Sequence, residues 1–309
     1  MANNKARCKI KDTTATLARS ITWAGSKQTF FTARLMVDKD LVGDFYRAYA
    51  YFRWVDDIID VSPQSNDELI SFIKRQKELI DHLYHGEILD DLAPEEKMLA
   101  ELISHDRGGG NGLQSFIRNM FANIEFDAFR RGSFISQQEL TRYSEWVGKS
   151  VTDGIQYFVG NGYLYPVSDS RYLAAIGAHL THLLRDMVTD IANGFINIPC
   201  EYLEANDISP ENRDSIPFRD WVQGQVEQAR QYFREGKGYL SKLNVLRCKI
   251  VGYWYCARFE GILDTIERDA YVLRASYNEK RKLSTYLNIV WLGISVTLRH
   301  IVHRARRKS

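Results

Sequence analysis

DFYRAYAYFRWVDDIID, residues 44–60, is a mostly apolar segment that ends in a run of aspartates. Its apolar residues recur at three- and four-residue spacing, which is typical of a helix. Asp56 and Asp60 are four residues apart, so they lie on one helix face with roughly 5–6 Å between their Cβ atoms. Asp57 lies beside them. Neighbouring carboxylates repel one another, and burying them is costly unless a cation compensates. The segment therefore predicts a cation site on a helix.

A second segment, LRDMVTD at residues 184–190, repeats this arrangement. Asp186 and Asp190 are again four apart in a helix of largely apolar residues. If the two helices face each other, four to five carboxylates converge on one cavity. Mg²⁺ suits such a cavity, because it typically binds one or two carboxylates and completes its shell with water and substrate phosphates. The pattern predicts a diphosphate substrate held through Mg²⁺.

Helical spacing continues through the rest of the chain, and no period-two run bounded by hairpin turns interrupts it. The 309 residues predict a single all-α domain, 1–309, with a core at about 20–287 and a basic amphipathic C-terminal segment at 286–309. The predicted helices are near 12–36, 39–61, 65–85, 94–105, 112–131, 136–160, 169–193, 218–241, 243–268 and 279–303.

The composition is that of an ordinary globular protein. With 41 Lys+Arg against 39 Asp+Glu, the formal net charge is only +2, which argues against a nucleic-acid partner. The four cysteines have no CxxC spacing and favour a reducing compartment. The N-terminus lacks the apolar core of a secretory signal, so we expect a cytoplasmic protein.

Residues 286–298 (YLNIVWLGISVTL) are apolar for too short a distance to span a bilayer. As a helix they are amphipathic, and the basic run RHIVHRARRKS follows from residue 299. The simpler interpretation is a last core helix with a solvated tail. The alternative is peripheral contact with the inner face of a membrane through this segment.

Other chemistries lack their signatures. The chain has no Glu-x-x-His motif, which a di-iron helical bundle requires. It also has no nucleotide-binding glycine loop and no GxSxG elbow.

The chain resembles the squalene/phytoene synthases, the head-to-head branch of the trans-isoprenyl diphosphate synthases, from about Ser26 to Leu287. Four blocks carry the resemblance in the family's order. They are TFFTARLM with YRAYAYFRWVDDIID (29–60), QELTRYSEWVGKSV (138–151), HLTHLLRDMVTDIANGFINIPCEYLEANDIS (179–209) and ARFEGILDTIERDAYVLRASYNEKRKL (257–283).

The resemblance implies an isoprenoid-synthase-type helical bundle around a central hydrophobic cavity, and a transferase of prenyl groups. Two allylic diphosphates, farnesyl or geranylgeranyl, would condense head to head through a cyclopropylcarbinyl diphosphate. The product would be a squalene-, dehydrosqualene- or phytoene-type hydrocarbon. Mg²⁺ is the implied cofactor, and NADPH is left open because only squalene formation needs a hydride. Prenyl diphosphates are the expected partners, and the chain is expected to be a monomer or a weak dimer.

The family's motifs assign three groups of site residues. The expected catalytic residues are Asp56, Asp60, Asp186, Asp190 and Tyr143. The expected substrate-binding residues are Lys27, Thr29, Phe30, Tyr49, Arg53, Val147, His179, His182, Arg185 and Arg274. The expected metal ligands are Asp56, Asp57, Asp60, Asp186, Asp190 and His182.

The sequence departs from the family at several of its positions. His179 and His182 replace a glutamine and an asparagine, and Ser276 stands where the family has an arginine. Imidazole is a poor ligand for Mg²⁺, so hydrogen bonding to diphosphate or water is the better role for His182. These departures leave room for a terpene cyclase or atypical prenyltransferase that ionises one diphosphate. A non-catalytic assembly protein on the same scaffold ranks last, because all five aspartates are present.

Overall fold

A computed structural model of the protein describes residues 13–61, 66–106, 112–277 and 283–306. Within these ranges the chain is helical and forms no strand, which confirms the all-α prediction. The helices are α1 (Thr13–Gly25), α2 (Lys27–Met36), α3 (Val42–Val61), α4 (Asn66–Tyr84), α5 (Pro94–Ser104), α6 (Leu113–Phe129), α7 (Gln137–Gly160), α8 (Leu173–Ala192), α9 (Cys200–Ala205), α10 (Ile216–Lys242), α11 (Leu246–Arg268) and α12 (Leu283–Arg306), with a 3₁₀ turn, η1 (Asp169–Arg171).

Every predicted range contains a helix, but the range 12–36 contains two. Ser26 has an extended backbone (φ −156°, ψ 100°), and its Oγ accepts a hydrogen bond of 3.1 Å from the backbone N–H of Thr29. A serine in this position caps the N-terminus of a helix, so α2 starts anew after α1. The six-residue α9 is not predicted, since it is too short to show a helical period.

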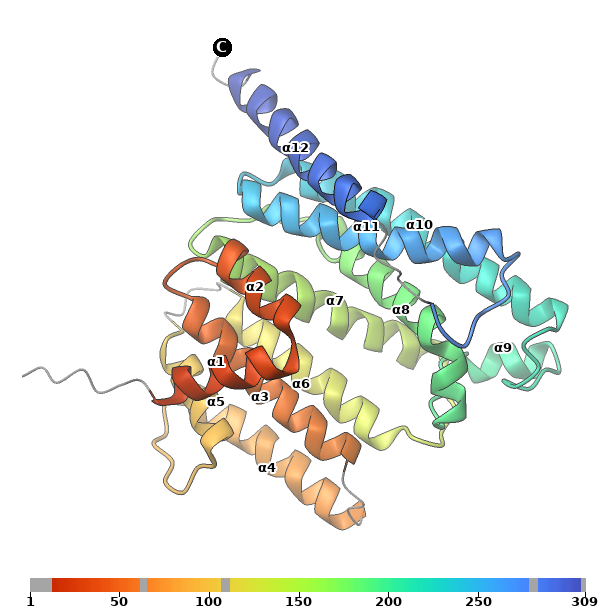
Figure 1. Ribbon diagram of the computed structural model, residues 1–309. Helices are drawn as coiled ribbons and strands as arrows, with labels where there is room; N and C mark the ends of the chain where they lie inside the picture. Colours follow the sequence, from red (N-terminus) through yellow and green to blue (C-terminus); the bar gives the residue numbers. More distant parts are fainter. Residues whose placement is uncertain (1–12, 62–65, 107–111, 278–282, 307–309) are drawn as a thin grey trace, which may run out of the picture. The chain divides into compact units, whose positions relative to one another are not determined.

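The chain divides into two compact units, Met1–Gln114 and Ser115–Ser309. Helices α1 to α5 belong to the first unit, and α7 to α12 belong to the second (Figure 1). The expectation of a single domain stays a prediction.

In the first unit, α3 packs against α1 and α5. Its buried face carries Ala48, Tyr51 and Val55, each no more than 3% exposed. The Arg47 guanidinium joins α3 to α5, because it lies 2.7 Å from Asp44 and 2.9 Å from Glu101. This packing fixes the rotation of α3 about its axis. Near its C-terminal end, Asp56 is exposed and Asp57 is about half exposed, so these two side chains lie off the buried face.

In the second unit, α8 packs against α7, α10 and α11. Leu184 and Met187 of α8 enter a fully apolar core with side chains from α10 and α11, such as Phe233 and Leu263. Two glycines allow close helix approach. A Cβ on Gly148 of α7 would lie 2.6 Å from Ile176, and one on Gly236 of α10 would lie 2.5 Å from the backbone nitrogen of Ala174.

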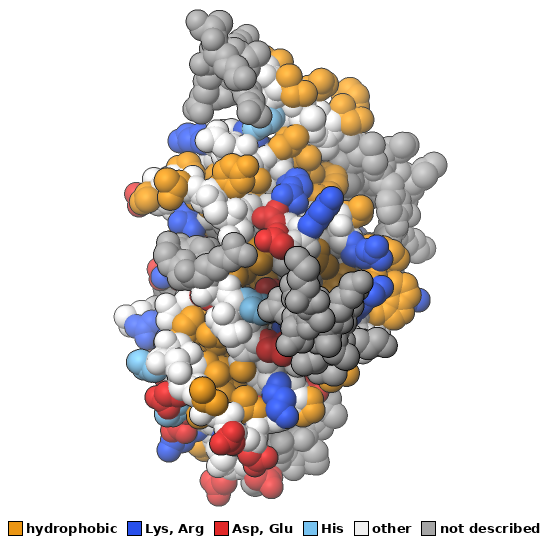
Figure 2. All heavy atoms as spheres, turned by 90° about the vertical axis from the view of Figure 1, so that its left-hand side faces the viewer, with side chains coloured by type: hydrophobic (Ala, Val, Ile, Leu, Met, Phe, Trp, Pro, Cys, Tyr) orange, Lys and Arg blue, Asp and Glu red, His pale blue; other side chains and the backbone are white. Residues whose placement is uncertain are grey.

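Two properties of the described helices and of the face in Figure 2 bear on a possible membrane contact. None of the described helices is long and apolar enough to cross a bilayer. On the face shown in Figure 2, Lys and Arg side chains are interspersed with Asp and Glu side chains, and neither sign covers the face.

Candidate active site

The first acidic helix face lies at the C-terminal half of α3. The Arg53 guanidinium is 2.5 Å from the Asp57 carboxylate, and both side chains are about half exposed (50% and 47%). The hydrogen bond that Arg53 donates to the Asp57 carboxylate raises the pKa of Arg53. Asp56 is exposed. Asp60 belongs to α3, but its side chain lies outside the described part of the chain.

The start of α2 supplies the other predicted residues of this unit. Lys27 and Thr29 are in its first turn, and the Lys27 ammonium lies 5.5 Å from the centre of the Trp23 ring. Phe30 is buried and stacks on Tyr46 at 5.2 Å. Tyr49 of α3 is half-buried and lies against Gly25, at the end of α1. Tyr49 precedes Arg53 by four residues, so the two side chains are neighbours on α3.

The second acidic face is a stripe along α8. His179, His182, Asp186 and Asp190 follow one another at three- and four-residue spacing. His182 Nε2 lies 2.9 Å from Asp186 Oδ2. Arg185 donates two hydrogen bonds of 2.7 Å to the two oxygens of the same carboxylate. Partial burial alone would raise the pKa of Asp186, but the hydrogen bonds from Arg185 and His182 outweigh it and lower that pKa well below its usual range.

Asp190 has the opposite environment. Its Oδ2 accepts one hydrogen bond of 3.0 Å, from the Asn197 amide. Burial, with repulsion from Asp186 as the next cause, raises the pKa of Asp190 to about 6. The two aspartates of α8 therefore differ. Arg185 and His182 compensate the negative charge of Asp186, whereas no basic side chain forms a hydrogen bond or ion pair with Asp190 in the described part of the chain.

This difference predicts opposite effects on stability. Because the folded state raises the pKa of Asp190, its ionised form costs stability above pH 6, and the cost disappears as the pH falls from 6 to 4. Asp190→Asn should therefore stabilise the metal-free protein by on the order of 1 kcal/mol at pH 8, a discounted figure because the group is partly solvated. Urea unfolding at pH 8 and pH 4.5 measures the effect.

Asp186→Asn is the matched control, since it loses the hydrogen bonds from Arg185 and His182. It should not gain stability at either pH. An equal gain from both variants at pH 8 would show that general charge reduction, rather than the environment of Asp190, is responsible.

The structure adds a cluster beside α8 that the sequence reasoning missed. Asp127, at the end of α6, accepts hydrogen bonds from the Tyr143 hydroxyl at 2.8 Å and from Arg130 Nε at 2.7 Å. The Arg130 guanidinium lies 5.1 Å from the centre of the Tyr143 ring and 5.2 Å from that of Phe195. Burial and the neighbouring Asp127 charge raise the pKa of Tyr143 well above its usual value. Tyr143 is therefore a protonated, buried hydroxyl held in a fixed position.

Three buried polar atoms in this cluster or on the residues next to it and to Asp190 have no partner within the described part of the chain: Arg130 Nη1, His179 Nε2 and Asn197 Oδ1. Their side chains are at most 9% exposed. His179 packs edge-on against Tyr143 at 4.6 Å, and burial, aided by the charges of His182 and Arg130, lowers its pKa to about 3. His179 is thus neutral at physiological pH. Buried polar atoms normally have a hydrogen-bond partner, so each of these three atoms can bind water or a polar group of a ligand.

A backbone link joins the two parts of this cluster. The Gly132 N–H, just after α6, donates a hydrogen bond of 2.8 Å to the carbonyl of Gly194, just after α8. Gly194 has a φ of +86°, which favours glycine. This link holds Asp127 and Arg130 next to the Asp190 end of α8. The only sequence signal for it was the Asp-x-x-Arg spacing at 127–130, which alone predicts nothing more than a local ion pair.

The remaining predicted residues lie on the flanks of the second unit. Val147 packs with Tyr143 in a small cluster between α7 and α8. Arg274, by contrast, forms an ion pair with Asp269 at 2.5 Å and is about half exposed. Its role in binding substrate stays a prediction.

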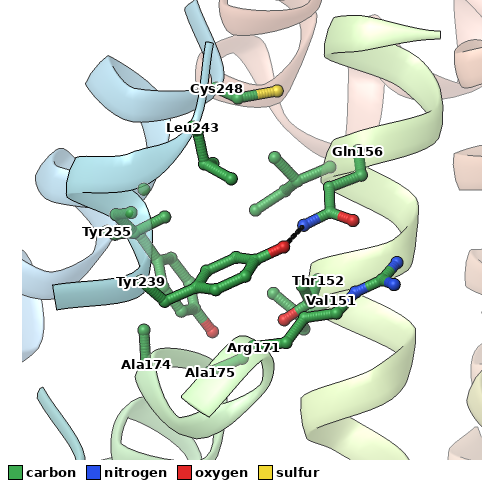
Figure 3. A pocket seen from close by; sticks show the side chains of 13 residues that line it. Val151, Thr152, Gln156, Arg171, Ala174, Ala175, Tyr239, Leu243, Cys248 and Tyr255 are labelled. Carbon is green, nitrogen blue, oxygen red and sulfur yellow. Dashed lines mark hydrogen bonds between the residues drawn. The ribbon is translucent and has the colours of Figure 1, made fainter. Parts of the chain in front are cut away.

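The same unit contains a small, partly open pocket between α7, α8, α10 and α11 (Figure 3). Its volume is about 40 Å³, and most of its lining is apolar. The Tyr239 hydroxyl accepts a hydrogen bond of 3.2 Å from the Gln156 amide across it. Ala175, in the lining, belongs to the same α8 stripe as Asp186 and precedes it by eleven residues. At 1.5 Å per residue, the pocket lies roughly 16 Å along α8 from the carboxylates.

Comparison with known proteins identifies the class. The sequence profile of the squalene/phytoene synthase family matches residues 24–286. The chain is 24% identical to the 15-cis-phytoene synthase of Synechocystis sp., over 91% of this chain and 85% of that protein. It is 25% identical to the chloroplastic phytoene synthase of Daucus carota, over 83% of this chain and 65% of that protein.

Solved structures show the same helical fold. The squalene synthase HpnC from Alicyclobacillus acidocaldarius has a TM-score of 0.69 at 19% identity, covering 85% of this chain and 96% of that one. A dehydrosqualene synthase in complex with ligand has a TM-score of 0.66 at 16% identity, covering 92% and 95%. The chain belongs to the squalene/phytoene synthase family. Members of this family are prenyltransferases that join prenyl groups head to head, so the chain is a transferase of prenyl groups.

Proposed function

We propose that the protein condenses two molecules of an allylic prenyl diphosphate, farnesyl or geranylgeranyl diphosphate, into a squalene-, dehydrosqualene- or phytoene-type hydrocarbon. The observation that carries this proposal is the α8 stripe, where Asp186 and Asp190 share one face with His182, and where Asp190 lies near buried polar atoms that have no partner within the described part of the chain. A second acidic face on α3, in a member of this family, supplies the matching site for another diphosphate.

The donor set suits Mg²⁺. Asp186 and Asp190 offer carboxylate oxygens one helical turn apart, and Mg²⁺ needs only one or two of them beside water and phosphate oxygens. No three described His, Cys, Asp or Glu side chains lie close enough together to hold a metal ion. When bound, the ion would stabilise the negative charge that develops on the leaving diphosphate. On α3 the proposed ligands are Asp56, Asp57 and Asp60.

The chain's own residues would position the diphosphates and exclude water. Arg53 and Arg185 now pair with the carboxylates next to them, and each can turn one N–H toward a phosphate oxygen. His182 lies on the same stripe of α8 and donates a hydrogen bond to the Asp186 carboxylate. Its proposed role is hydrogen bonding to diphosphate or to bound water. Arg130 offers a buried polar atom near Asp190, and His179 offers one next to Tyr143, so both can bind oxygens of a leaving group.

The proposed reaction has two steps, and each begins with the departure of one diphosphate. One diphosphate leaves with the electron pair of its C–O bond, and the double bond of the second substrate attacks the allylic cation. Loss of a proton then gives a cyclopropylcarbinyl diphosphate. Departure of the second diphosphate and rearrangement give a cation that either loses a proton or accepts a hydride from NADPH. A hydrocarbon product partitions into lipid, so peripheral membrane contact is part of this proposal.

A substrate panel tests the proposal. Purified protein is incubated with Mg²⁺ and geranyl, farnesyl or geranylgeranyl diphosphate, with and without NADPH, and the lipid extract is analysed by mass spectrometry. We expect a hydrocarbon with twice the carbon number of its substrate, and loss of product when EDTA removes the metal. Products with a single prenyl unit's carbon number would instead support the one-diphosphate enzyme. Absence of diphosphate release from every substrate would refute both.

A further inference from the structure

Helix α12 has an exposed apolar stripe that no described part of the chain covers. Large apolar side chains recur along it at helical spacing, each roughly half exposed or more: Trp291 (70%), Ile294 (47%), Leu298 (57%), Ile301 (57%) and Val302 (52%). From Trp291 to Val302 the stripe is roughly 16 Å long. Isolated exposed apolar residues are common, whereas a contiguous stripe on one helix marks an interaction surface.

The opposite face of α12 holds it on the second unit. Val296 is 5% exposed, and the position of a Cβ on Gly293 lies 3.4 Å from the Trp254 ring of α11. In a helix Val296 lies across the axis from both Ile294 and Leu298, because it is two residues from each. Figure 1 shows α12 starting against α11 and projecting away from that helix toward its own C-terminal end. Hydrophobic side chains are also exposed at the top of Figure 2, the level of that end in Figure 1.

The positive charge of residues 280–309 indicates which kind of surface the stripe would bind. Residues 280–309 contain eight Lys and Arg and no Asp or Glu. Since the whole chain has 41 basic and 39 acidic residues, the remaining 279 residues have 33 basic against 39 acidic, a formal charge of −6. Arg299, which flanks the stripe, is exposed. An apolar stripe within a strongly cationic segment is complementary to an anionic lipid surface.

A second copy of the chain fits this surface less well. Two α12 helices packed stripe to stripe would bring two segments of charge +8 together, which is repulsive. The stripe also lies beyond residue 286, where the match to the family ends, so the prenyl transfer common to the family does not account for it.

We infer that α12 lies in the plane of an anionic membrane, with the stripe Trp291, Ile294, Leu298, Ile301 and Val302 inserted at the level of the lipid headgroups and the basic residues facing anionic lipid. The inference does not depend on which prenyl diphosphate the enzyme uses.

Flotation of the full-length protein with vesicles tests the inference. The probes are phosphatidylcholine vesicles with and without 30 mol% phosphatidylserine. We expect binding to the anionic vesicles to be at least tenfold stronger, and to weaken as salt screens the charges. The variant Trp291→Gln/Leu298→Gln/Ile301→Gln should lose at least tenfold in binding. The matched control Ile88→Gln/Leu164→Gln/Val167→Gln changes three equally exposed apolar residues elsewhere (95%, 100% and 97%) and should bind as the wild type does.

A second measurement locates the stripe in the bilayer with a substitution that should not weaken membrane binding. Brominated lipid should quench the fluorescence of Trp291 on binding, and Trp291→Phe should bind normally but show a smaller quenching. Three results would overturn the inference: no binding of the wild type to anionic vesicles, an equal loss in both triple variants, or a dimer that dissociates in the α12 variant while vesicle binding is unchanged. The last result would make a second copy the occupant of the stripe.

Discussion

Asp186→Ala should reduce turnover of an allylic diphosphate by on the order of 10³-fold, and Asp60→Ala should do the same. Each substitution removes a proposed metal ligand, so the charge on the departing diphosphate loses part of its stabilisation. Release of inorganic pyrophosphate measures turnover. Raising the Mg²⁺ concentration should recover part of the rate, because the remaining ligands bind the ion more weakly.

The fold should survive these changes. The Asp186 side chain is 37% exposed and contacts residues of its own helix, so helix content measured by circular dichroism should stay near the wild-type value. Glu235→Ala, an exposed acidic residue of α10, is the control and should keep full activity. Wild-type rates in Asp186→Ala or Asp60→Ala would contradict the assignment of these residues as metal ligands.

Gly236→Ala should destabilise the protein by about 3 kcal/mol, the upper part of the range for overpacked cores. A Cβ at this position would lie 2.5 Å from the backbone nitrogen and 2.8 Å from the Cα of Ala174. These are backbone atoms of α8, so neither helix can relieve the clash by turning a side chain. We expect the melting temperature to fall by about 6–12 °C.

Gly238→Ala, two residues further along α10, is a matched control. A Cβ there would meet nothing within 4 Å, so the substitution should gain about 1 kcal/mol from helix propensity. The two variants should thus shift the melting temperature in opposite directions. Equal shifts would mean that α8 and α10 do not approach each other as closely as the structure shows.

Most of the helical fold was predictable from the sequence. The three- and four-residue spacing of apolar side chains predicted a helix in every range where a long one is present. The break at Ser26 was missed because apolar residues continue on both sides of it and no proline marks it. Helix α9 was missed because six residues complete fewer than two helical turns. Both features depend on local capping or tertiary contact rather than on periodicity.

The site was predictable only where its residues share one helix. The four-residue spacing placed Asp186 and Asp190 on one face of α8, and the structure agrees. The cluster of Asp127, Arg130, Tyr143 and Phe195 forms through contacts between separate segments, which spacing along one helix does not reveal. The resulting difference between the two aspartates, with only Asp190 left largely uncompensated, was likewise unpredictable.

The central proposal is that the aspartates of α3 and those of α8 each hold a metal-bound diphosphate. The most direct test is a crystal structure of the protein with Mg²⁺ and an unreactive thiolo analogue of farnesyl diphosphate. The account predicts metal ions and phosphate oxygens of the analogue at Asp56 or Asp60 of α3 and at Asp186 or Asp190 of α8. An analogue bound to one helix alone, with the other helix's aspartates facing bulk solvent elsewhere, would contradict it.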